Sequence, residues 1–435
     1  MLKDFKLKID NFGSINEADL DISKINIIAG KNASGKTTIS KLLYCIVTAF
    51  STDGKYLIYE NIKEQMMSII NSIQFSQQDN IKEVDEIRFE IGTDREYKIE
   101  TIEKNYEKLE KIINSLDLSD KNFFLDNIKK NKIRISRIKE IGRYWIILTD
   151  LIKNEFSGGE QLINNFKNSE ITLYNDDNVN QFEYYVRIRE GIGVGPKTKY
   201  NNRIMTNYEA IYIETPYFLD YKIPFSQVTF PGKKQYHQEL LFQKLIDQSS
   251  KNNILDNINN DDIIKFQKTI NEEIGGEFKF NNVGLLEFNQ NNKIYELPNT
   301  STGIKSLGII QLLLENRKLN PNTFLIMDEP EVHLHPEWQV KLAKILVLLV
   351  KDLNVKLFIN SHSPQFIEAI EVYSVKYGLK DDTRFYLTEK DEKSKKYNIK
   401  QISLKNLYSI YDNLGDPYDI IDKVRGENIA NHLGG

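Results

Sequence analysis

The chain has 435 residues with 58 Lys and Arg against 62 Asp and Glu, so its formal net charge of −4 gives no overall basic field for nucleic acid. This length buries a large core and exceeds one typical domain. The single cysteine, Cys45, excludes an intramolecular disulfide, and five histidines with one cysteine argue against a structural zinc site. Apolar runs such as residues 345–350 are too short to span a membrane, and residues 1–4 begin no signal peptide. We therefore expect a cytoplasmic protein with no membrane contact.

The first informative motif in chain order is GKNASGKT at residues 30–37, which fits the P-loop pattern G-x-x-x-x-G-K-[ST]. An apolar run at 25–29 predicts a buried strand before it, and residues 38–43 predict a helix after it. Backbone N–H groups of such a loop turn toward a phosphate at a helix N-terminus, whereas a turn that binds nothing is the alternative. Lys36 would reach the β- and γ-phosphates, and the Thr37 hydroxyl would hold Mg²⁺. The predicted nucleotide-binding residues here are Gly30, Lys31, Asn32, Ala33, Ser34, Gly35, Lys36, Thr37 and Thr38.

The middle of the chain carries only local patterns. Residues 86–92 and 97–102 predict a β-hairpin, and residues 184–189 and 209–215 predict strands. Residues 231–275 predict helices. One further helix, too short for a long coiled coil, is predicted from apolar residues at helical spacing, which are Ile102, Tyr106, Leu109, Ile113 and Leu116.

Basic residues gather at 129–143, where Glu140 is the one acidic residue opposing them in sequence. They are Lys129, Lys130, Lys132, Arg134, Arg137, Lys139 and Arg143. Four interleaved isoleucines, Ile133, Ile135, Ile138 and Ile141, predict an apolar side packed inward and a basic side outward. A solvated face is the simpler interpretation; DNA, RNA or an acidic partner surface is the alternative.

Two carboxylates follow a buried strand at 324–327, the arrangement of a Walker B motif. Asp328 would hold the Mg²⁺ shell and Glu329 would polarise the attacking water, although a solvated strand end would carry the same letters. A further strand at 355–359 leads into Ser361 and His362, and the motif order predicts His362 to be a γ-phosphate sensor. Glu331, His333 and His335 could resemble metal ligands, but the prolines that flank them favour loop and packing roles.

Together these motifs resemble the ABC-type ATPases, specifically the SMC/RecF/OLD branch. The resemblance rests on LKIDNFGS at residues 7–14, on Asn32 within the P-loop and on DEPEVHLHP at 328–336. It covers roughly residues 1–50 and 280–375. The resemblance implies an α/β fold, a two-lobed P-loop head with a mixed central sheet, flanking helices and helical insertions.

The domain organisation expected from this resemblance is split. Residues 1–100 would form lobe I with the P-loop, and 101–205 an inserted arm. Residues 206–230 would return a core strand to the head, 231–280 would form a second helical arm, and 281–435 would form lobe II. No convincing Gln follows the returning strand, so the family's Q-loop residue stays unassigned.

The resemblance also implies a signature that a second subunit presents to the γ-phosphate, and two segments compete for it. FSGGEQ at 156–161 has the family spelling, but it lies far upstream of Asp328 and also fits an S-x-x-E capping box. STGIK at 301–305 has poorer spelling but begins the helix that leads directly into the Walker B strand. Because geometry makes the contact, we assign the signature to Ser301 and Gly303.

The function implied is ATP hydrolysis with Mg²⁺, in a homodimer or higher oligomer that closes around ATP. One hypothesis is a switch that gates a separate effector, such as a Toprim or HNH nuclease, and resembles the ATPase subunits of PARIS-, Septu- and retron-type antiphage systems. The stretch after His362 is too short for a Toprim fold, which favours a separate nuclease. The alternative is a RecF- or SMC-like ATPase of DNA repair or chromosome maintenance; a transporter subunit fits the motifs poorly.

Overall fold

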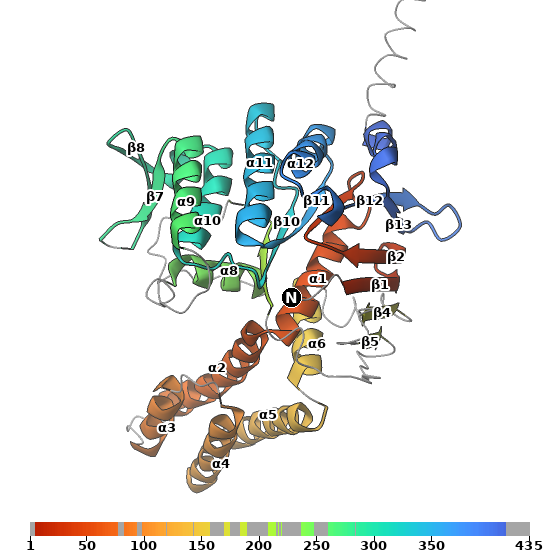
Figure 1. Ribbon diagram of the computed structural model, residues 1–435. Helices are drawn as coiled ribbons and strands as arrows, with labels where there is room; N and C mark the ends of the chain where they lie inside the picture. The colour runs from red at the N-terminus through yellow and green to blue at the C-terminus, as the bar shows by residue number, and fades with distance from the viewer. Residues whose placement is uncertain are drawn as a thin grey trace, which may run out of the picture. The chain divides into compact units, whose positions relative to one another are not determined.

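The computed structural model describes residues 5–76, 82–93, 98–118, 120–141, 143–156, 169–174, 183–188, 208–214, 216, 219, 236–247, 260–282 and 284–414. The chain divides into two compact units, shown in Figure 1. The first combines Met1–Tyr44 with Lys153–Gly435, and the second is Cys45–Ile152. Each unit is described by itself.

The first unit contains a ten-stranded sheet within the described residues, in the order β5-β4-β1-β2-β13-β12-β3-β11-β10-β6. The neighbours β12, β3, β11, β10 and β6 run parallel, whereas β5, β4, β1 and β2 pair antiparallel. The strands are β1 Phe5–Phe12, β2 Ile15–Ile22, β3 Ile25–Ala29, β4 Ser169–Tyr174, β5 Glu183–Ile188, β6 Glu209–Ile213, β10 Thr323–Asp328, β11 Lys356–Ser361, β12 Thr383–Lys390 and β13 Tyr397–Ile402.

The parallel strands bring their carboxyl ends to one edge of this sheet. Every residue of β3, β10 and β11 is buried, as expected for central strands covered on both faces. Loops at the carboxyl ends of neighbouring parallel strands meet, which is where α/β proteins place their ligands. The P-loop, Asp328 and the Ser361–His362 step therefore converge, and the predicted α/β class is correct.

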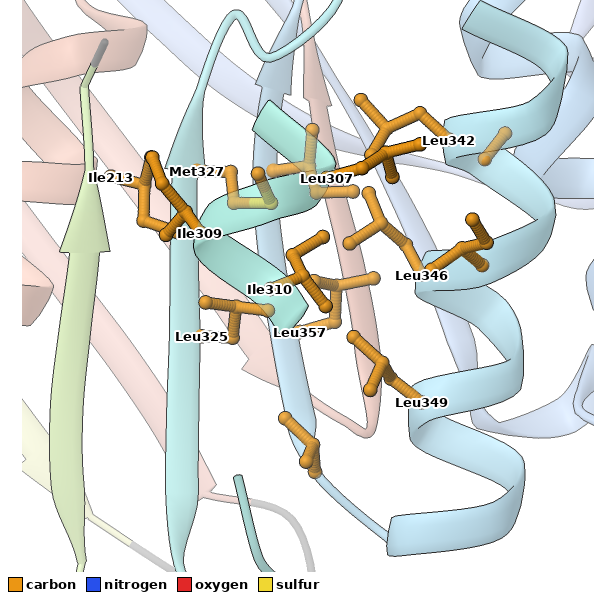
Figure 2. Packing of buried hydrophobic residues seen from close by; sticks show 14 of the residues in the cluster. Ile213, Leu307, Ile309, Ile310, Leu325, Met327, Leu342, Leu346, Leu349 and Leu357 are labelled. Atoms are coloured by element: carbon orange, nitrogen blue, oxygen red, sulfur yellow. The ribbon is translucent and has the colours of Figure 1, made fainter. Parts of the chain in front are cut away.

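Helices pack on the sheet through a continuous apolar core. Figure 2 shows Ile310 of α10 lying between Leu325 of β10 and Leu346 of α11, with Leu307 of α10 near Leu342 of α11. The first unit's helices are α8 Tyr236–Ile246, α9 Asn260–Ile274, α10 Thr302–Glu315, α11 Pro336–Leu353 and α12 Pro364–Lys376, together with the start of α1 Lys36–Phe50 and the end of α6 Arg143–Glu155. Short 3₁₀ turns occupy Leu297–Asn299, Lys380–Asp382 and Leu404–Asn406.

A small antiparallel sheet lies beside α10 and is formed by β7 Glu277–Phe280, β8 Leu286–Gln290 and β9 Lys293–Glu296. A Cβ at Gly308 would lie 2.4 Å from a ring carbon of Phe278. The missing side chain therefore lets the phenyl ring lie directly against α10, and Phe278 and Phe288 complete this part of the core.

The second unit is helical within its described residues. It contains α2 Thr52–Ser76, α3 Lys82–Thr93, α4 Ile99–Ser115 and α5 Lys121–Ile141, together with the rest of α1 and the first part of α6. The arm helix predicted from Ile102 onward is confirmed as α4.

The hairpin predicted at 86–92 and 97–102 is wrong, because residues 86–92 lie in α3 and residues 99–102 lie in α4. Ile87, Phe89 and Ile91 alternate as in a strand, but Phe89 is 73% exposed whereas Ile87 and Ile91 are buried. Burial instead follows Val84, Ile87 and Ile91, the spacing of one helix face. The apolar letters fitted both periods, and packing selected the helical one.

Two strands from the region assigned to the 101–205 arm belong to the main sheet. β5 confirms the strand predicted at 184–189, and β4 was not predicted. β4 pairs with β1 from Lys6 opposite Tyr174 to Asp10 opposite Glu170. A returning strand expected at 209–215 is confirmed as β6, which pairs with β10.

Candidate nucleotide-binding site

The predicted P-loop forms a tight turn between β3 and α1. Lys31, Asn32 and Ala33 are exposed at its tip, whereas the following Ser34 and Gly35 are buried. Ala33 and Gly35 have φ of 60° and 91°, a left-handed backbone that costs a non-glycine residue about 1–2 kcal/mol. Such a cost at a non-glycine residue is typical of functional loops.

Gly30 is required by close approach. A Cβ there would lie 1.9 Å from Thr388 Oγ1 of β12, so a larger residue would push the loop off the sheet. The first residue of the P-loop thus packs directly on β12. Helix α1 begins at Lys36. Thr38 is half-buried on the first turn of α1.

Lys36 folds back over the P-loop. Its Nζ donates to the carbonyl oxygens of Gly30 at 2.9 Å and Lys31 at 3.0 Å, and it lies 3.3 Å from Glu329 Oε1. The side chain is only 4% exposed. The predicted phosphate-binding cation and the predicted general base are therefore in direct contact.

Asp328 is held by three donors at the end of β10. Thr37 Oγ1 donates to its Oδ2 at 2.7 Å, Tyr212 Oη to the same oxygen at 3.2 Å, and Asn360 Nδ2 to Oδ1 at 2.8 Å. Burial raises the pKa of Asp328, while the hydrogen bonds from Asn360 and Thr37 oppose that shift. The predicted Mg²⁺ ligands Thr37 and Asp328 thus lie side by side.

This donor set fits magnesium. Mg²⁺ takes oxygen ligands and is commonly held by one or two carboxylates together with substrate phosphates. One buried carboxylate beside one hydroxyl matches that description, and the described residues contain no group of three or more His, Cys, Asp and Glu side chains arranged for a metal.

Glu329 lies between Lys36 and His362. Its Oε1 is 3.3 Å from Lys36 Nζ and 3.2 Å from His362 Nδ1. A hydrogen bond with His362 lowers the pKa of Glu329 against the effect of burial, and the same interaction raises the pKa of His362. The backbone at Glu329 has φ 48° and its N donates to Asn360 O at 2.9 Å, which fixes this left-handed residue in place. The structure thus brings all three predicted catalytic side chains together.

Glu331 binds the loop that carries His362 of this cluster. It is 2% exposed, and its Oε1 accepts from Ser361 Oγ at 2.6 Å and from His362 N at 3.1 Å. His335, in contrast, is exposed and caps α11 by accepting from the N of Glu337 at 3.4 Å. Sequence reasoning noted Glu331 but missed this orienting contact, which joins two loops 30 residues apart.

The two signature candidates are unequally described. Ser157–Gln161 of the FSGGEQ segment lie outside the described residues. Ser301 caps α10, with its Oγ accepting from Ile304 N at 3.4 Å. Gly303 is buried, and a Cβ there would lie 3.2 Å from Leu334 Cδ2, so Ser301 and Thr302 are the more accessible residues of this terminus. The signature role of Ser301 and Gly303 stays a prediction.

The basic stretch on α5 is less basic than its sequence indicated. Lys132 pairs with Glu110, Arg134 with Asp150, and Lys139 with Glu103 at 2.5 Å. These carboxylates come from α4 and α6, so the statement that Glu140 alone opposes the patch is wrong. Ile135 and Ile138 are buried as expected, but Ile133 is 48% exposed.

A family profile described as AAA ATPase domain matches residues 5–367. The chain belongs to this AAA ATPase domain family. Membership implies nucleotide binding and agrees with the convergence of Lys36, Thr37 and Asp328 at one sheet edge. A search of curated proteins finds no match.

Comparison with solved structures returns low-identity likenesses to SMC heads. An SMC head domain from Thermotoga maritima has 10% identity and a TM-score of 0.43, covering 93% of this chain and 100% of that one. An SmcHead bound to the C-winged helix domain of ScpA has 10% identity and a TM-score of 0.45, covering 94% and 100%. An Smc head with an extended coiled coil, bound to a C-terminal domain of ScpA derived from Pyrococcus furiosus, has 11% identity and a TM-score of 0.41, covering 97% and 98%.

Tyr212, which donates to Asp328, was not identified from sequence, and neither were Glu214 and Asn360 of this AAA ATPase site. Glu214, just past β6, lines a cavity of about 250 Å³ together with Thr302, Ser306, Asp328 and Glu329. Asn360 joins Asp328 to Ser40 Oγ of α1 at 2.6 Å. Their positions depend on strand pairing rather than on a local motif. None of the helices in the described part of the chain has the length and apolarity needed to cross a membrane.

Proposed function

We propose that this protein is an ATP-hydrolysing switch of the ABC type, in which two copies close around ATP and gate a separate effector. One observation carries the proposal: Lys36, Thr37, Asp328, Glu329 and His362 meet at the carboxyl ends of β3, β10 and β11. Their order is that of phosphate cation, metal ligands, base and sensor.

The chain's residues divide the chemistry among them. Lys36 would bind the β- and γ-phosphates as a point charge, and Thr37 and Asp328 would hold the Mg²⁺ that accompanies them. When bound, Mg²⁺ supplies charge neutralisation on the phosphate oxygens. Glu329 accepts the proton of the attacking water, and His362 orients Glu329 and senses the γ-phosphate. Ser301 and Gly303 of a second copy contribute the helix N-terminus that completes each site.

For the biological role, we propose antiphage defence with a separate nuclease effector, such as a Toprim or HNH enzyme, in the cytoplasm. Support comes from the sequence resemblance to such two-component ATPases. A RecF- or SMC-like role on DNA is the other candidate. It draws less support from α5, where Lys132, Arg134 and Lys139 are each paired with a carboxylate.

The decisive experiment is Glu329→Gln. The substitution keeps size and hydrogen bonding but removes the charge that accepts a proton, and general bases contribute about 10²–10⁴-fold in rate. Steady-state ATP hydrolysis should nearly stop while ATP binding persists, because Lys36 and Thr37 are unchanged. Light scattering should then show a dimer that forms only with ATP and Mg²⁺.

Two outcomes would contradict the proposal. Hydrolysis at the wild-type rate would show that another group activates the water. A variant that binds ATP, does not hydrolyse it and never changes its oligomeric state would exclude closure around ATP. Lys24→Ala is the matched control, since Lys24 pairs with Asp382 at 2.7 Å at the opposite end of β3 and should leave both readouts unchanged.

A further inference from the structure

A buried histidine–carboxylate pair contacts the tyrosine that donates to the predicted metal ligand. Glu155, the last residue of α6, and His237, in the first turn of α8, have side chains only 0% and 1% exposed. His237 Nδ1 lies 2.5 Å from Glu155 Oε2, and the backbone N of His237 donates to Glu155 Oε1 at 3.0 Å. Charged groups buried this deeply persist only when they are paired and hydrogen-bonded.

The histidine has a second carboxylate partner. His237 Nε2 lies 3.4 Å from Glu214 Oε2, and Lys41 Nζ lies 3.2 Å from Glu214 Oε1. Burial would lower the pKa of His237, but its hydrogen bonds to Glu155 and Glu214 outweigh burial and raise it. The interaction with His237 in turn lowers the pKa of Glu214 to about 2. The ring is therefore held at Nδ1 by Glu155 and has the Glu214 carboxylate beside Nε2.

This fixed ring supports Tyr212. The rings of His237 and Tyr212 pack edge to face with centroids 4.8 Å apart. The ring centroid of Tyr44 lies 5.9 Å from that of Tyr212. Tyr212 is 1% exposed, and burial raises its pKa, so its phenol remains an O–H donor. That hydroxyl donates to Asp328 Oδ2 at 3.2 Å. The contacts thus run in order from Glu155 through His237 and Tyr212 to Asp328.

We propose that Glu155 and His237 are positioning residues that hold Tyr212 so that its hydroxyl orients Asp328 toward the metal–nucleotide complex. Asp328 Oδ2 accepts from Thr37 and Tyr212. If the Thr37 hydroxyl oxygen ligates a bound cation, Thr37 no longer donates to Asp328 Oδ2. Of the two donors, only Tyr212 then still holds that oxygen. This inference rests on the proposed function, since it takes Asp328 as the metal ligand.

The test measures binding rather than turnover. The affinity of each variant for a fluorescent ATP analogue is titrated once with Mg²⁺ and once with EDTA. Tyr212→Phe keeps the ring but removes the hydroxyl, and groups that orient metal ligands contribute about 10–100-fold to metal affinity. Tyr212→Phe should therefore weaken binding in Mg²⁺ by at least about tenfold and leave binding in EDTA unchanged.

Variants of the histidine–carboxylate pair extend the test. His237→Gln and Glu155→Gln should show the same Mg²⁺-specific loss, with the loss in Glu155→Gln the smaller, because the amide keeps a hydrogen-bond acceptor for the backbone N of His237. Tyr208→Phe is the matched control: Tyr208 is a buried tyrosine at the opposite end of β6, packed on Phe324 with centroids 5.3 Å apart. It should bind like the wild type under both conditions.

Asp328→Asn separates the two levels of failure. It should abolish the Mg²⁺-dependent part of binding; if it does not, the metal role of Asp328 fails, and the proposed function fails with it. If Asp328→Asn behaves as expected but Tyr212→Phe keeps wild-type Mg²⁺ dependence, only the positioning role is overturned. Loss in Tyr212→Phe without loss in a folded His237→Gln or Glu155→Gln would remove the histidine–carboxylate pair from the proposal. Thermal unfolding of each variant identifies those that fold, and Tyr212→Phe decides the hydroxyl's role independently of the others.

Discussion

The sheet edge in the first unit and helix α5 in the second unit both bring opposite charges together, but in different ways. At the edge, Lys36 is 4% exposed and is held by two carbonyl oxygens and Glu329. On α5, Lys132 is 32% exposed and is paired with Glu110, itself 42% exposed. Buried charges cost several kcal/mol unless fixed partners surround them, whereas exposed pairs contribute about 0–1 kcal/mol. The comparison shows that the fixed partners of Lys36 come from its three-dimensional surroundings, whereas the charge cluster in the sequence of α5 resolves into separate exposed pairs.

Lys36→Ala should give the largest effect in this comparison. Truncating one partner of a buried charge contact costs about 2–5 kcal/mol in binding, so ATP affinity should fall roughly 30-fold to several thousandfold. Isothermal titration calorimetry measures it directly. ATP affinity equal to that of the wild type would remove the basis of the P-loop assignment.

A medium effect should separate the two signature candidates. Gly303→Asp adds a negative charge at the start of α10, which would repel a γ-phosphate docked there, so ATP-dependent dimerisation seen by light scattering should be lost. Because any side chain at 303 meets Leu334, Gly303→Ala is the matched control and should weaken closure less. Gly158→Asp should leave ATP hydrolysis nearly intact; the reverse pattern would assign the signature to FSGGEQ.

The smallest effect is expected on α5. A double-mutant cycle of Lys132→Ala with Glu110→Ala should give a coupling of about 0.2–1 kcal/mol in urea unfolding, decreasing with added salt. Coupling well above this range and insensitive to salt would mean that the pair is organised like the sheet edge.

The site residues that belong to contiguous sequence motifs were predictable. The P-loop, Asp328-Glu329 and His362 each follow a buried strand, and parallel pairing of those strands brings them together. Asn360 and Tyr212 were missed because their contacts join elements distant in sequence, such as Asn360 of β11 with Ser40 of α1, 320 residues away, and Tyr212 of β6 with Asp328 of β10.

The strands of the main sheet were predictable for the same reason. The prediction was wrong where one apolar pattern fits both the strand period and the helix period. A strand formed almost entirely by apolar residues, such as β10, is predicted with little ambiguity. Ile87, Phe89 and Ile91 alternate as in a strand, but the segment is helical and Phe89 is exposed. β4 has an alternating burial pattern, but only its pairing with β1 identifies it as part of the main sheet.

The contact between Gly303 and Trp338 has an optical consequence. A Cβ at Gly303 would lie 3.5 Å from the Trp338 indole, and Lys341 Nζ lies 5.0 Å from the ring centroid. The chain has two tryptophans, so Trp145→Phe leaves Trp338 as the one indole emitter. Its emission depends on the charge and water around the ring, and both change if a second copy covers the start of α10. If two copies close at the predicted signature as proposed, Trp338 fluorescence in the Trp145→Phe variant would report that closure in real time without a label.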